Sequence, residues 1–261
     1  MLPRREDPVD AQQQLKESLG SAVATAEPGL SAADQLCRAC VDLLDVDGAA
    51  VSVIHGDAMR GTFGSSGKLS RHLDELQFTF GEGPCLESVR SSRPVLVADF
   101  QDPDEQRWPA YAGAVLESGV RAVYALPVAV ATLCVGALDL FRNRPGPLIG
   151  DGLVGGLLAA ELAALPLLDL MTAEVDWDAA AQGDRDGWEQ LASLERVEVY
   201  QATGMILAAL DIGPTEALVR LRAHAFATGS TASDVAWSIV ERRLSLDGDA
   251  WRSLGPRGPA R

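Results

Sequence analysis

The C-terminal part of the chain constrains its fold most strongly, because apolar residues recur there at three- and four-residue spacing between about residues 188 and 244. Pro214 fits the first turn of a helix, where its missing N–H is tolerated. Gly229 can end that helix in a left-handed conformation, and Thr231 and Asp234 have the spacing of a capping box that starts another one. The pattern therefore predicts a compact all-α bundle of three helices.

Two strings of residues in this bundle carry a family resemblance. Glu195–Ile206 lies in the first helix, which is predicted from about Trp188 to Leu210, and Glu216–Ala225 lies in the second. In their order of small, apolar and basic residues, both strings resemble the ANTAR signature of actinobacterial regulators. ANTAR domains bind paired RNA hairpins in nascent transcripts and prevent termination. The resemblance therefore implies an RNA-binding regulator of transcription antitermination, with structured RNA as its partner.

The resemblance also implies which residues contact RNA. Helical spacing puts Arg220 and His224 one turn apart on one flank of the apolar face of their helix, while Arg222 lies on the other flank. Many family members have a lysine where this chain has Thr203, so one charge that would contact phosphate is missing. The implied RNA-binding residues are Arg196, Thr203, Gly204, Arg220, Arg222, His224, Arg242 and Arg243.

The charge of the chain leaves a second interpretation open. Residues 188–247 contain five arginines and no lysine against eight Asp and Glu, and the whole chain has a net charge of -15 at pH 7. Such a charge repels RNA at long range, whereas RNA affinity normally rests on phosphate neutralisation. RNA binding would therefore need a locally arranged basic patch. The alternatives are a dimerisation or protein-interaction module with little RNA binding, or a redox or cyclic-nucleotide sensor with another output.

The region that precedes the C-terminal helices has a different pattern of apolar residues. Its strand-like runs alternate with helical segments, and this order predicts an α+β fold built on a central antiparallel sheet with flanking helices. Ser31 can cap a helix over residues 32–44, whereas the glycine and polar residues of 56–80 predict loops around a pocket. The predicted strands are Ala49–His55, Pro94–Ala98, Arg121–Val130 and Leu133–Phe141.

Three further strings, Phe80–Glu87, Arg93–Asp99 and Gly119–Val128, look like a GAF domain, and the resemblance extends over about residues 28–171. GAF domains are α+β modules that sense small molecules, and many act as dimerisation platforms. The resemblance implies a homodimeric sensor whose small-molecule ligand is unknown, and no cofactor is assigned. The order of a GAF sensor before an ANTAR output domain matches a family of actinobacterial transcription regulators.

A glycine pair and a cysteine mark the candidate ligand site. Gly81 and Gly83 would permit a sharp turn with close backbone approach to a ligand, although a strand-to-helix turn without a ligand explains the same pair. Cys85 follows at a helix start, where a thiolate would be stabilised, so a thiol sensor stays an alternative. The candidate ligand-binding residues are Gly81, Gly83, Cys85, Trp108 and Tyr124.

Neither a catalytic site nor a metal site is predicted. Cys37 and Cys40 have the spacing seen in metal sites, but they fall within a predicted helix and lack a second cysteine pair or enough histidines as partners. The sequence contains no nucleophile elbow, metal-binding histidine pair or kinase-type glycine loop. The protein is therefore expected not to be an enzyme.

One apolar segment, Gly152–Met171, approaches the length of a membrane span. Asp151 and Glu161 argue against insertion, and its leucines suit a helix that packs against a domain or a partner subunit. No apolar secretory signal begins the sequence, so a cytoplasmic location without membrane contact is expected. The predicted organisation is a partly helical extension over 1–27, a GAF sensor domain over 28–171, a linker over 172–187, an ANTAR domain over 188–247 and a flexible tail over 248–261.

Overall fold

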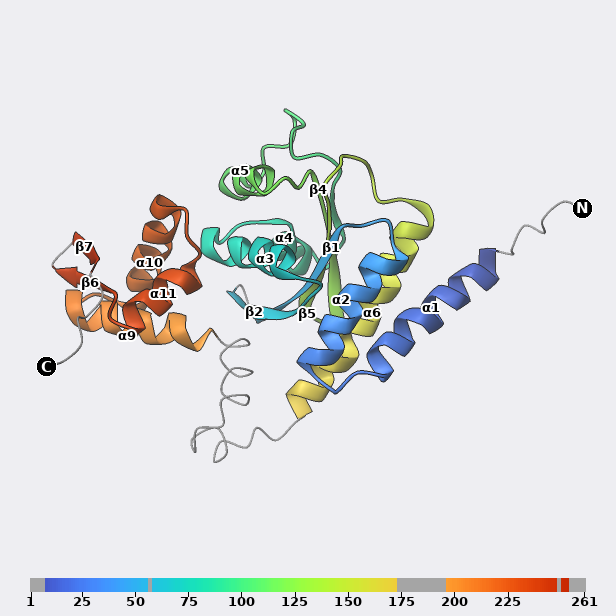
Figure 1. The fold of residues 1–261 in the computed structure, drawn as a ribbon, viewed down its shortest axis with the longest axis horizontal. Coiled ribbons are helices and arrows are strands. Elements are labelled where there is room, and N and C mark those ends of the chain that lie inside the picture. Colours follow the sequence, from blue (N-terminus) through green and yellow to red (C-terminus); the bar gives the residue numbers. More distant parts are fainter. Residues whose placement is uncertain (1–7, 56–57, 173–195, 248–249, 254–261) are drawn as a thin grey trace, which may run out of the picture.

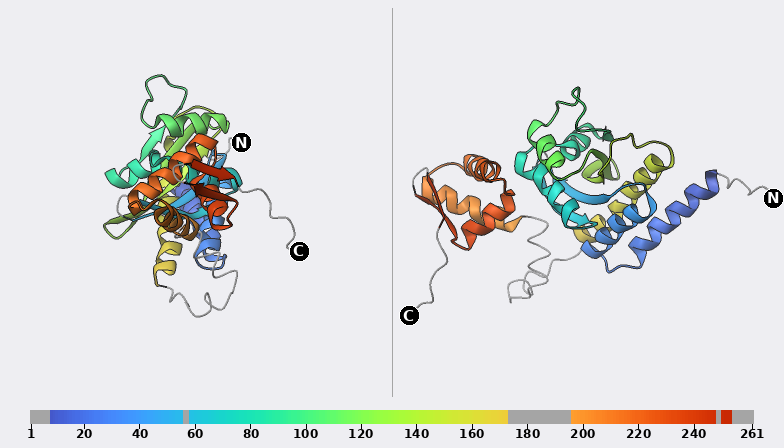
Figure 2. Two further views of the ribbon diagram at one scale, coloured as in Figure 1. Left: turned by 90° about the vertical axis from the view of Figure 1, so that its left-hand side faces the viewer. Right: turned by 45° about the horizontal axis from the view of Figure 1, so that its top comes forward.

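The computed structural model describes residues 8–55, 58–172, 196–247 and 250–253. An α+β unit with a central sheet and helices on both faces is followed by a smaller C-terminal unit built mainly from helices (Figure 1). The C-terminal unit lies at one end of the molecule, and helix α1 (Pro8–Ala24) lies at the opposite end (Figures 1 and 2). The predicted linker from residue 173 onward and the predicted helical stretch 188–195 lie outside the described residues.

The central sheet has five strands in the order β2-β1-β5-β4-β3, and every neighbouring pair is antiparallel, as the sequence predicts. Successive side chains of a strand point to opposite faces, so each helix layer meets its own set of residues. In β5, Leu138 and Leu140 belong to the apolar core on one face, while Asp139 points to the other. The strands are β1 (Gly48–His55), β2 (Ala58–Ser65), β3 (Val95–Val97), β4 (Ala122–Val130) and β5 (Leu133–Arg142).

Helices α2 (Leu30–Leu43) and α6 (Gly150–Thr172) cover the face of the sheet that carries the leucines. α1 packs against both α2 and α6. α2 confirms the helix that the sequence predicts over residues 32–44. Ser31 does not cap it, however, because the N-cap position falls on Gly29 and no side chain makes a capping hydrogen bond there.

Helix α6 is long and apolar enough to cross a membrane: the window 150–168 has a mean hydropathy of 1.6, and 44% of it is buried. It packs on α1, α2 and β4, as the helix of a domain core does. Leu153, Leu158 and Leu162 make part of this contact, as the sequence pattern predicts, and small residues make the rest. A Cβ on Gly156 would lie 2.7 Å from Leu126 Cδ1, whereas Leu157 and Leu165 are exposed.

The opposite face of the sheet is covered by α3 (Lys68–Phe80), α4 (Pro84–Ser91) and α5 (Pro109–Glu117). The prediction of loops over 56–80 is therefore wrong, since this stretch contains β2 and α3. Its polar residues are misleading because Asp74 and Gln77 of α3 are buried, against the usual trend. Gly64 marks a close approach within β2, where an added Cβ would lie 2.6 Å from the Cβ of Ala33.

The C-terminal unit contains α9 (Val197–Leu210), α10 (Pro214–Thr228), α11 (Ala232–Val240), β6 (Leu244–Asp247) and β7 (Ala250–Ser253). The predicted punctuation is confirmed: Pro214 begins α10, and Gly229 ends it with a φ of 64°. Thr231 and Asp234 form the predicted capping box of α11. Helix α9 begins at Val197, with Arg196 at its N-cap in a left-handed conformation with a φ of 48°, and the predicted helix start at Trp188 lies outside the described residues.

A β-hairpin completes this unit and was not predicted. β6 pairs antiparallel with β7, although residues from 248 onward are predicted to form a flexible tail. Trp251 of β7 stacks on His224 of α10, with 4.3 Å between ring centroids. The unit is therefore three helices closed by a hairpin rather than all-α.

Candidate functional site

Two arginines of the C-terminal unit clamp one aromatic ring of α3. The guanidinium carbon of Arg196 lies 4.1 Å from the centroid of the Phe78 ring, and that of Arg222 lies 4.5 Å from it. An arginine over an aromatic face within about 6 Å is held by the ring quadrupole. Two of the residues that the sequence implies for RNA contact are therefore covered by the α+β unit.

Burial leaves part of both guanidinium groups without partners. Arg196 Nη1 donates to Ser233 Oγ at 3.1 Å, but Nε and Nη2 of Arg196 and Nε of Arg222 are buried and make no hydrogen bond to any described residue. Burial lowers the pKa of both arginines, and the charge of Arg196 lowers that of Arg222 further. Since an unpaired buried N–H costs about 1–3 kcal/mol, this contact holds the two cations in an incompletely satisfied state.

Further contacts join α3 to the C-terminal unit. The backbone N–H of Ala232, at the start of α11, donates to Thr79 Oγ1 at 2.9 Å. The rings of Phe80 and Phe226 meet edge to face, with centroids 5.6 Å apart. Beside them, a cleft of about 450 Å³ lies between α3, α5 and α10. The end of α3 is thus the point where the two units meet.

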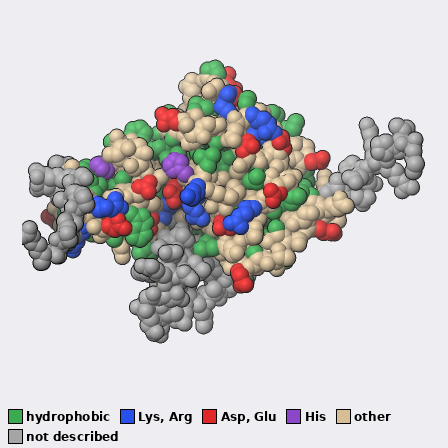
Figure 3. Space-filling model, in the orientation of Figure 1, with side chains coloured by type: hydrophobic (Ala, Val, Ile, Leu, Met, Phe, Trp, Pro, Cys, Tyr) green, Lys and Arg blue, Asp and Glu red, His purple; other side chains and the backbone are tan. Residues whose placement is uncertain are grey.

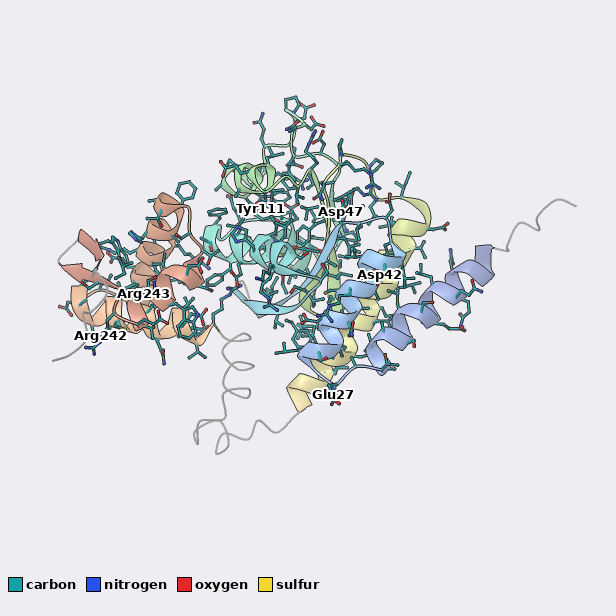
Figure 4. All side chains as sticks on the ribbon, viewed as in Figure 1. Glu27, Asp42, Asp47, Tyr111, Arg242 and Arg243 are labelled. Atoms are coloured by element: carbon teal, nitrogen blue, oxygen red, sulfur yellow. The ribbon has the colours of Figure 1, made fainter. Side chains whose placement is uncertain are left out.

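The other implied RNA-binding residues lie away from this junction. Arg220 pairs with Glu216 at 2.9 Å, and Arg242 and Arg243 follow α11 at the outer end of the unit (Figure 4). Burial against its surroundings lowers the pKa of His224. Thr203 and Gly204 lie on α9, and neither carries a charge. On the face drawn in Figure 3, basic and acidic side chains are intermixed, so the described residues present no continuous basic patch there.

A second cluster of polar side chains lies inside the α+β unit, between the sheet and α3. Ser52 of β1 and Thr62 of β2 are direct partners across the two strands, and both hydroxyls donate to the carboxylate of Asp74. Gln77 Nε2 donates to Asp139 of β5, and Gln77 Oε1 accepts the Cys85 N–H at 2.9 Å. All of these side chains are buried. The sheet, α3 and the start of α4 are therefore tied together by hydrogen bonds in the core.

Two atoms of this cluster have no partner. Asp139 Oδ1 and the hydroxyl of Tyr111, from α5, are buried and make no hydrogen bond within the described residues. Burial raises the pKa of Asp139 well above its usual range, and the carboxylate of Asp74 raises it further. Burial also raises the pKa of Asp74, although the hydrogen bonds from Ser52 and Thr62 lower it in part. The core therefore contains two carboxyl groups that are costly to ionise together.

The structure brings only part of the candidate ligand site to this cluster. Cys85 is in it, but burial raises the pKa of its thiol well above the usual range, so the expectation of a stabilised thiolate at the helix start is wrong. Gly83 contacts Gln77, while Gly81 ends α3 close to Arg222. The two cysteines of the Cys-x-x-Cys pair are likewise buried in α2, and burial raises the pKa of Cys40 to about 12.

Two candidate aromatics lie elsewhere. Tyr124 belongs to the core beneath α2 and α6, on the other face of the sheet, and its hydroxyl donates to the Gly146 carbonyl at 2.5 Å. Trp108 stands at the N-cap of α5 with the guanidinium of Arg107 4.3 Å from its ring centroid. Sequence reasoning missed Asp139, although a carboxylate between two leucines of an apolar strand is a signal that could have found it.

Replacing Gly83 should destabilise the fold. Gly83 has a φ of 144°, and an added Cβ would meet the Gln77 side chain that bridges α4 and Asp139. Strain of this kind costs about 1–3 kcal/mol, so Gly83→Ala should lower the free energy of unfolding in urea by at least that range. Gly67→Ala is the matched control, because Gly67 also precedes a helix but has extended backbone and open space around it. Equal stability of the two variants would contradict the prediction.

The five-stranded antiparallel sheet and its flanking helices define a domain of the α+β class. Residues 31–160 match the family model described as GAF domain, so this part of the chain is a GAF domain. The match ends before the C-terminal unit, and no curated protein matches the chain.

Solved structures of GAF domains resemble the chain at low identity. The GAF domain of an Acinetobacter phosphoenolpyruvate-protein phosphotransferase has 13% identity and a TM-score of 0.48 over 61% of this chain and 95% of its own. The corresponding domain from Coxiella burnetii has 16% identity and a TM-score of 0.48 over 68% of this chain and 99% of its own. A Thermoplasma acidophilum free methionine-R-sulfoxide reductase has 14% identity and a TM-score of 0.41 over 59% and 95%.

Proposed function

We propose that this protein is an RNA-binding transcription antitermination regulator, in which the GAF domain controls a C-terminal ANTAR output unit. The observation that carries the proposal is the clamp of Arg196 and Arg222 on Phe78. Both arginines belong to the set that the ANTAR resemblance implies for RNA contact. A GAF domain that covers them can regulate RNA binding by holding or releasing them.

The strength of the clamp suits a switch. Each cation–π contact contributes about 0.5–2 kcal/mol, but the three guanidinium nitrogens that are unpaired among the described residues oppose it. Phosphate oxygens would satisfy those donors and neutralise both charges once the ring is released. The free-energy difference between the covered and released states is then a few kcal/mol. A ligand that binds one state more tightly can shift the populations of two states that differ by this amount.

The rest of the proposal concerns assembly, location and chemistry. We propose a homodimer in the cytoplasm that has no enzymatic activity and makes no membrane contact. Exposed leucines on the outer side of α6, Leu157 and Leu165, support a second copy as partner, since apolar side chains there find no cover within the described chain. Two output units in one dimer would bind paired hairpins with a raised effective concentration.

Binding of the full-length protein to a paired-hairpin RNA tests the proposal, with salt concentration varied. Arg220→Ala combined with Arg222→Ala should weaken binding at least about tenfold and reduce the salt slope by about 2, since each lost phosphate contact reduces it by about 1. The matched control is Arg38→Ala with Arg93→Ala, which removes two exposed charges from the GAF domain and should leave binding unchanged. Sedimentation of the same sample reports the oligomeric state.

A protein-interaction module is the second candidate. It is favoured by large apolar side chains on the C-terminal unit, since Phe226 is 60% exposed and Trp237 is 45% exposed. Apolar association depends little on salt, whereas phosphate contacts weaken steeply as salt rises. This candidate would be favoured if hairpin RNA fails to bind at low ionic strength. The result should hold both for the wild type and for a variant whose arginine clamp is weakened.

A further inference from the structure

Three side chains of metal-binding type converge in the core of the GAF domain. An oxygen of Asp74 on α3, Sγ of Cys85 on α4 and an oxygen of Asp139 on β5 all lie within 4.8 Å of one another, and all three residues are buried. Bonds from zinc to oxygen are about 2.0–2.2 Å and to sulfur about 2.3 Å, so tetrahedral ligands of one ion lie about 3.5 Å apart. An inward shift of each atom by up to about 0.7 Å would therefore bring the three atoms to coordination distance.

A fourth group supports a ligand at this point. The hydroxyl of Tyr111 is fully buried, finds no hydrogen-bond partner in the part of the chain that the structure describes, and interacts electrostatically with all three residues of the cluster. Asp139 Oδ1 is also buried and unpaired within that part. Tyr111 projects into the core from α5 (Figure 4). An unpaired buried donor and an unpaired buried acceptor that belong to the same electrostatic cluster cost about 1–3 kcal/mol each, unless a ligand satisfies them.

The charge of the cluster selects the kind of ligand. Among the residues that the structure describes, neither Asp74 nor Asp139 makes a direct ion pair with an arginine or lysine, although the charges of Arg196 and Arg71 act on Asp74 from farther away. Two neighbouring buried carboxylates without a cation in contact repel each other, and buried charges are normally paired or coordinate a metal. A cation placed between them removes the repulsion, whereas an anionic ligand would increase it.

We infer that Asp74, Cys85 and Asp139 bind one divalent first-row transition-metal ion, with the Tyr111 hydroxyl at the remaining position. The mixture of one sulfur and several oxygen ligands suits Zn²⁺ or Fe²⁺. Mg²⁺ and Ca²⁺ prefer oxygen ligands only. On binding, the Cys85 thiol and the Asp139 carboxyl group release their protons to solvent as their bonds to the metal form, so both carboxyl groups bind in their ionised form.

The surrounding hydrogen bonds hold the ligands in place. Ser52 and Thr62 fix the carboxylate of Asp74, and Gln77 orients Asp139 while it also holds the backbone of Cys85. Such outer partners keep metal ligands in the geometry that an ion requires. Because the cluster is enclosed, the ion enters when the chain folds or when the core opens, and loading should be tested on protein that has folded with metal present.

The test uses full-length protein produced in medium supplemented with Zn²⁺ or, without oxygen, with Fe²⁺. Elemental analysis after gel filtration should find one ion per chain in at least one of the two preparations, and the preparation that retains it identifies the metal. Protein refolded with Co²⁺ should show a thiolate-to-cobalt charge-transfer band. Chelator treatment during refolding should remove the ion and lower Tm, since a ligand that binds only the folded state stabilises it.

Variants distinguish this cluster from other sites. Cys85→Ser should abolish the charge-transfer band, and Asp139→Asn, which keeps a hydrogen-bond acceptor for Gln77, should reduce the metal content strongly. Cys134→Ser is the matched control, because Cys134 lies half-buried at the other end of β5 and should leave the content at one ion per chain. These readouts do not involve RNA, so they are independent of the proposed function.

Two results would overturn the inference. One is a metal content far below one ion per chain in the Zn²⁺, Fe²⁺ and refolded samples. The other is an unchanged content in folded Cys85→Ser and Asp139→Asn proteins, which would place any bound ion elsewhere. Circular dichroism establishes that the variants are folded.

Discussion

Phe78→Leu should raise the affinity of the full-length protein for hairpin RNA about tenfold. Leucine keeps an apolar side chain at the end of α3 but has no aromatic face, so both cation–π contacts are lost. A loss of about 1.4 kcal/mol from the covered state corresponds to that factor. The salt slope should also become steeper, because Arg196 and Arg222 then reach phosphate in a larger fraction of the molecules. Fluorescence anisotropy of a labelled hairpin over a salt series measures both quantities.

The matched control for this prediction is Phe100→Leu. Phe100 is as buried as Phe78 and also contacts an aromatic ring, but its partner is Tyr111 within the GAF domain. This variant should lose stability without a gain in RNA affinity. If Phe78→Leu binds RNA no more tightly than the wild type, the arginine clamp does not control binding and the proposed regulation is wrong.

Asp139→Asn should flatten the pH dependence of stability in protein refolded with chelator. Burial raises the pKa of Asp139, so the folded state holds a proton that the unfolded chain releases above about pH 4. The contribution of Asp139 is therefore fully present below the pKa of the unfolded carboxyl group and is lost as pH rises towards the folded pKa. Thermal unfolding at intervals from about pH 5 to about pH 8 should show a smaller fall in Tm for the variant.

Several neighbours share or oppose this behaviour. Asp74 has a raised pKa for the same reason, and Cys85 and Tyr111 titrate higher still, so only the difference between variant and wild type isolates Asp139. Asp99→Asn is the control of opposite sign. Burial raises the pKa of Asp99, but hydrogen bonds from the Gln101 N–H and from Arg121 lower it by more, so the net shift is downward. A Tm profile for Asp139→Asn parallel to that of the wild type would contradict the prediction.

Local signals of the chain were sufficient for much of the fold. The cap of α11 depends on residues three apart, and the start of α10 depends on one proline, so both could be read from the sequence. The four predicted strands are present for a similar reason, since their apolar runs are continuous. The RNA-binding output of the C-terminal unit stays a prediction.

What sequence reasoning missed depends on contacts between distant residues. Helix α3 looks polar because Asp74 and Gln77 meet partners from β1, β2 and β5, which lie far away in the chain. Arg196 has a left-handed backbone within a predicted helix, and its side chain lies over Phe78, a residue that is distant in sequence. The residues of the Asp74–Cys85–Asp139 cluster come from α3, α4 and β5, so no short sequence motif indicates that they lie together.

Helix α3 carries Asp74 and Phe78 four residues apart, so they lie about one turn from each other along its axis. One residue belongs to the enclosed polar core, and the other belongs to the arginine clamp. If an ion in the core changes how tightly the clamp holds, thermodynamic linkage requires that RNA change the affinity for that ion by the same factor. The output partner would then act on the input site, so metal retention would itself report whether transcript is bound.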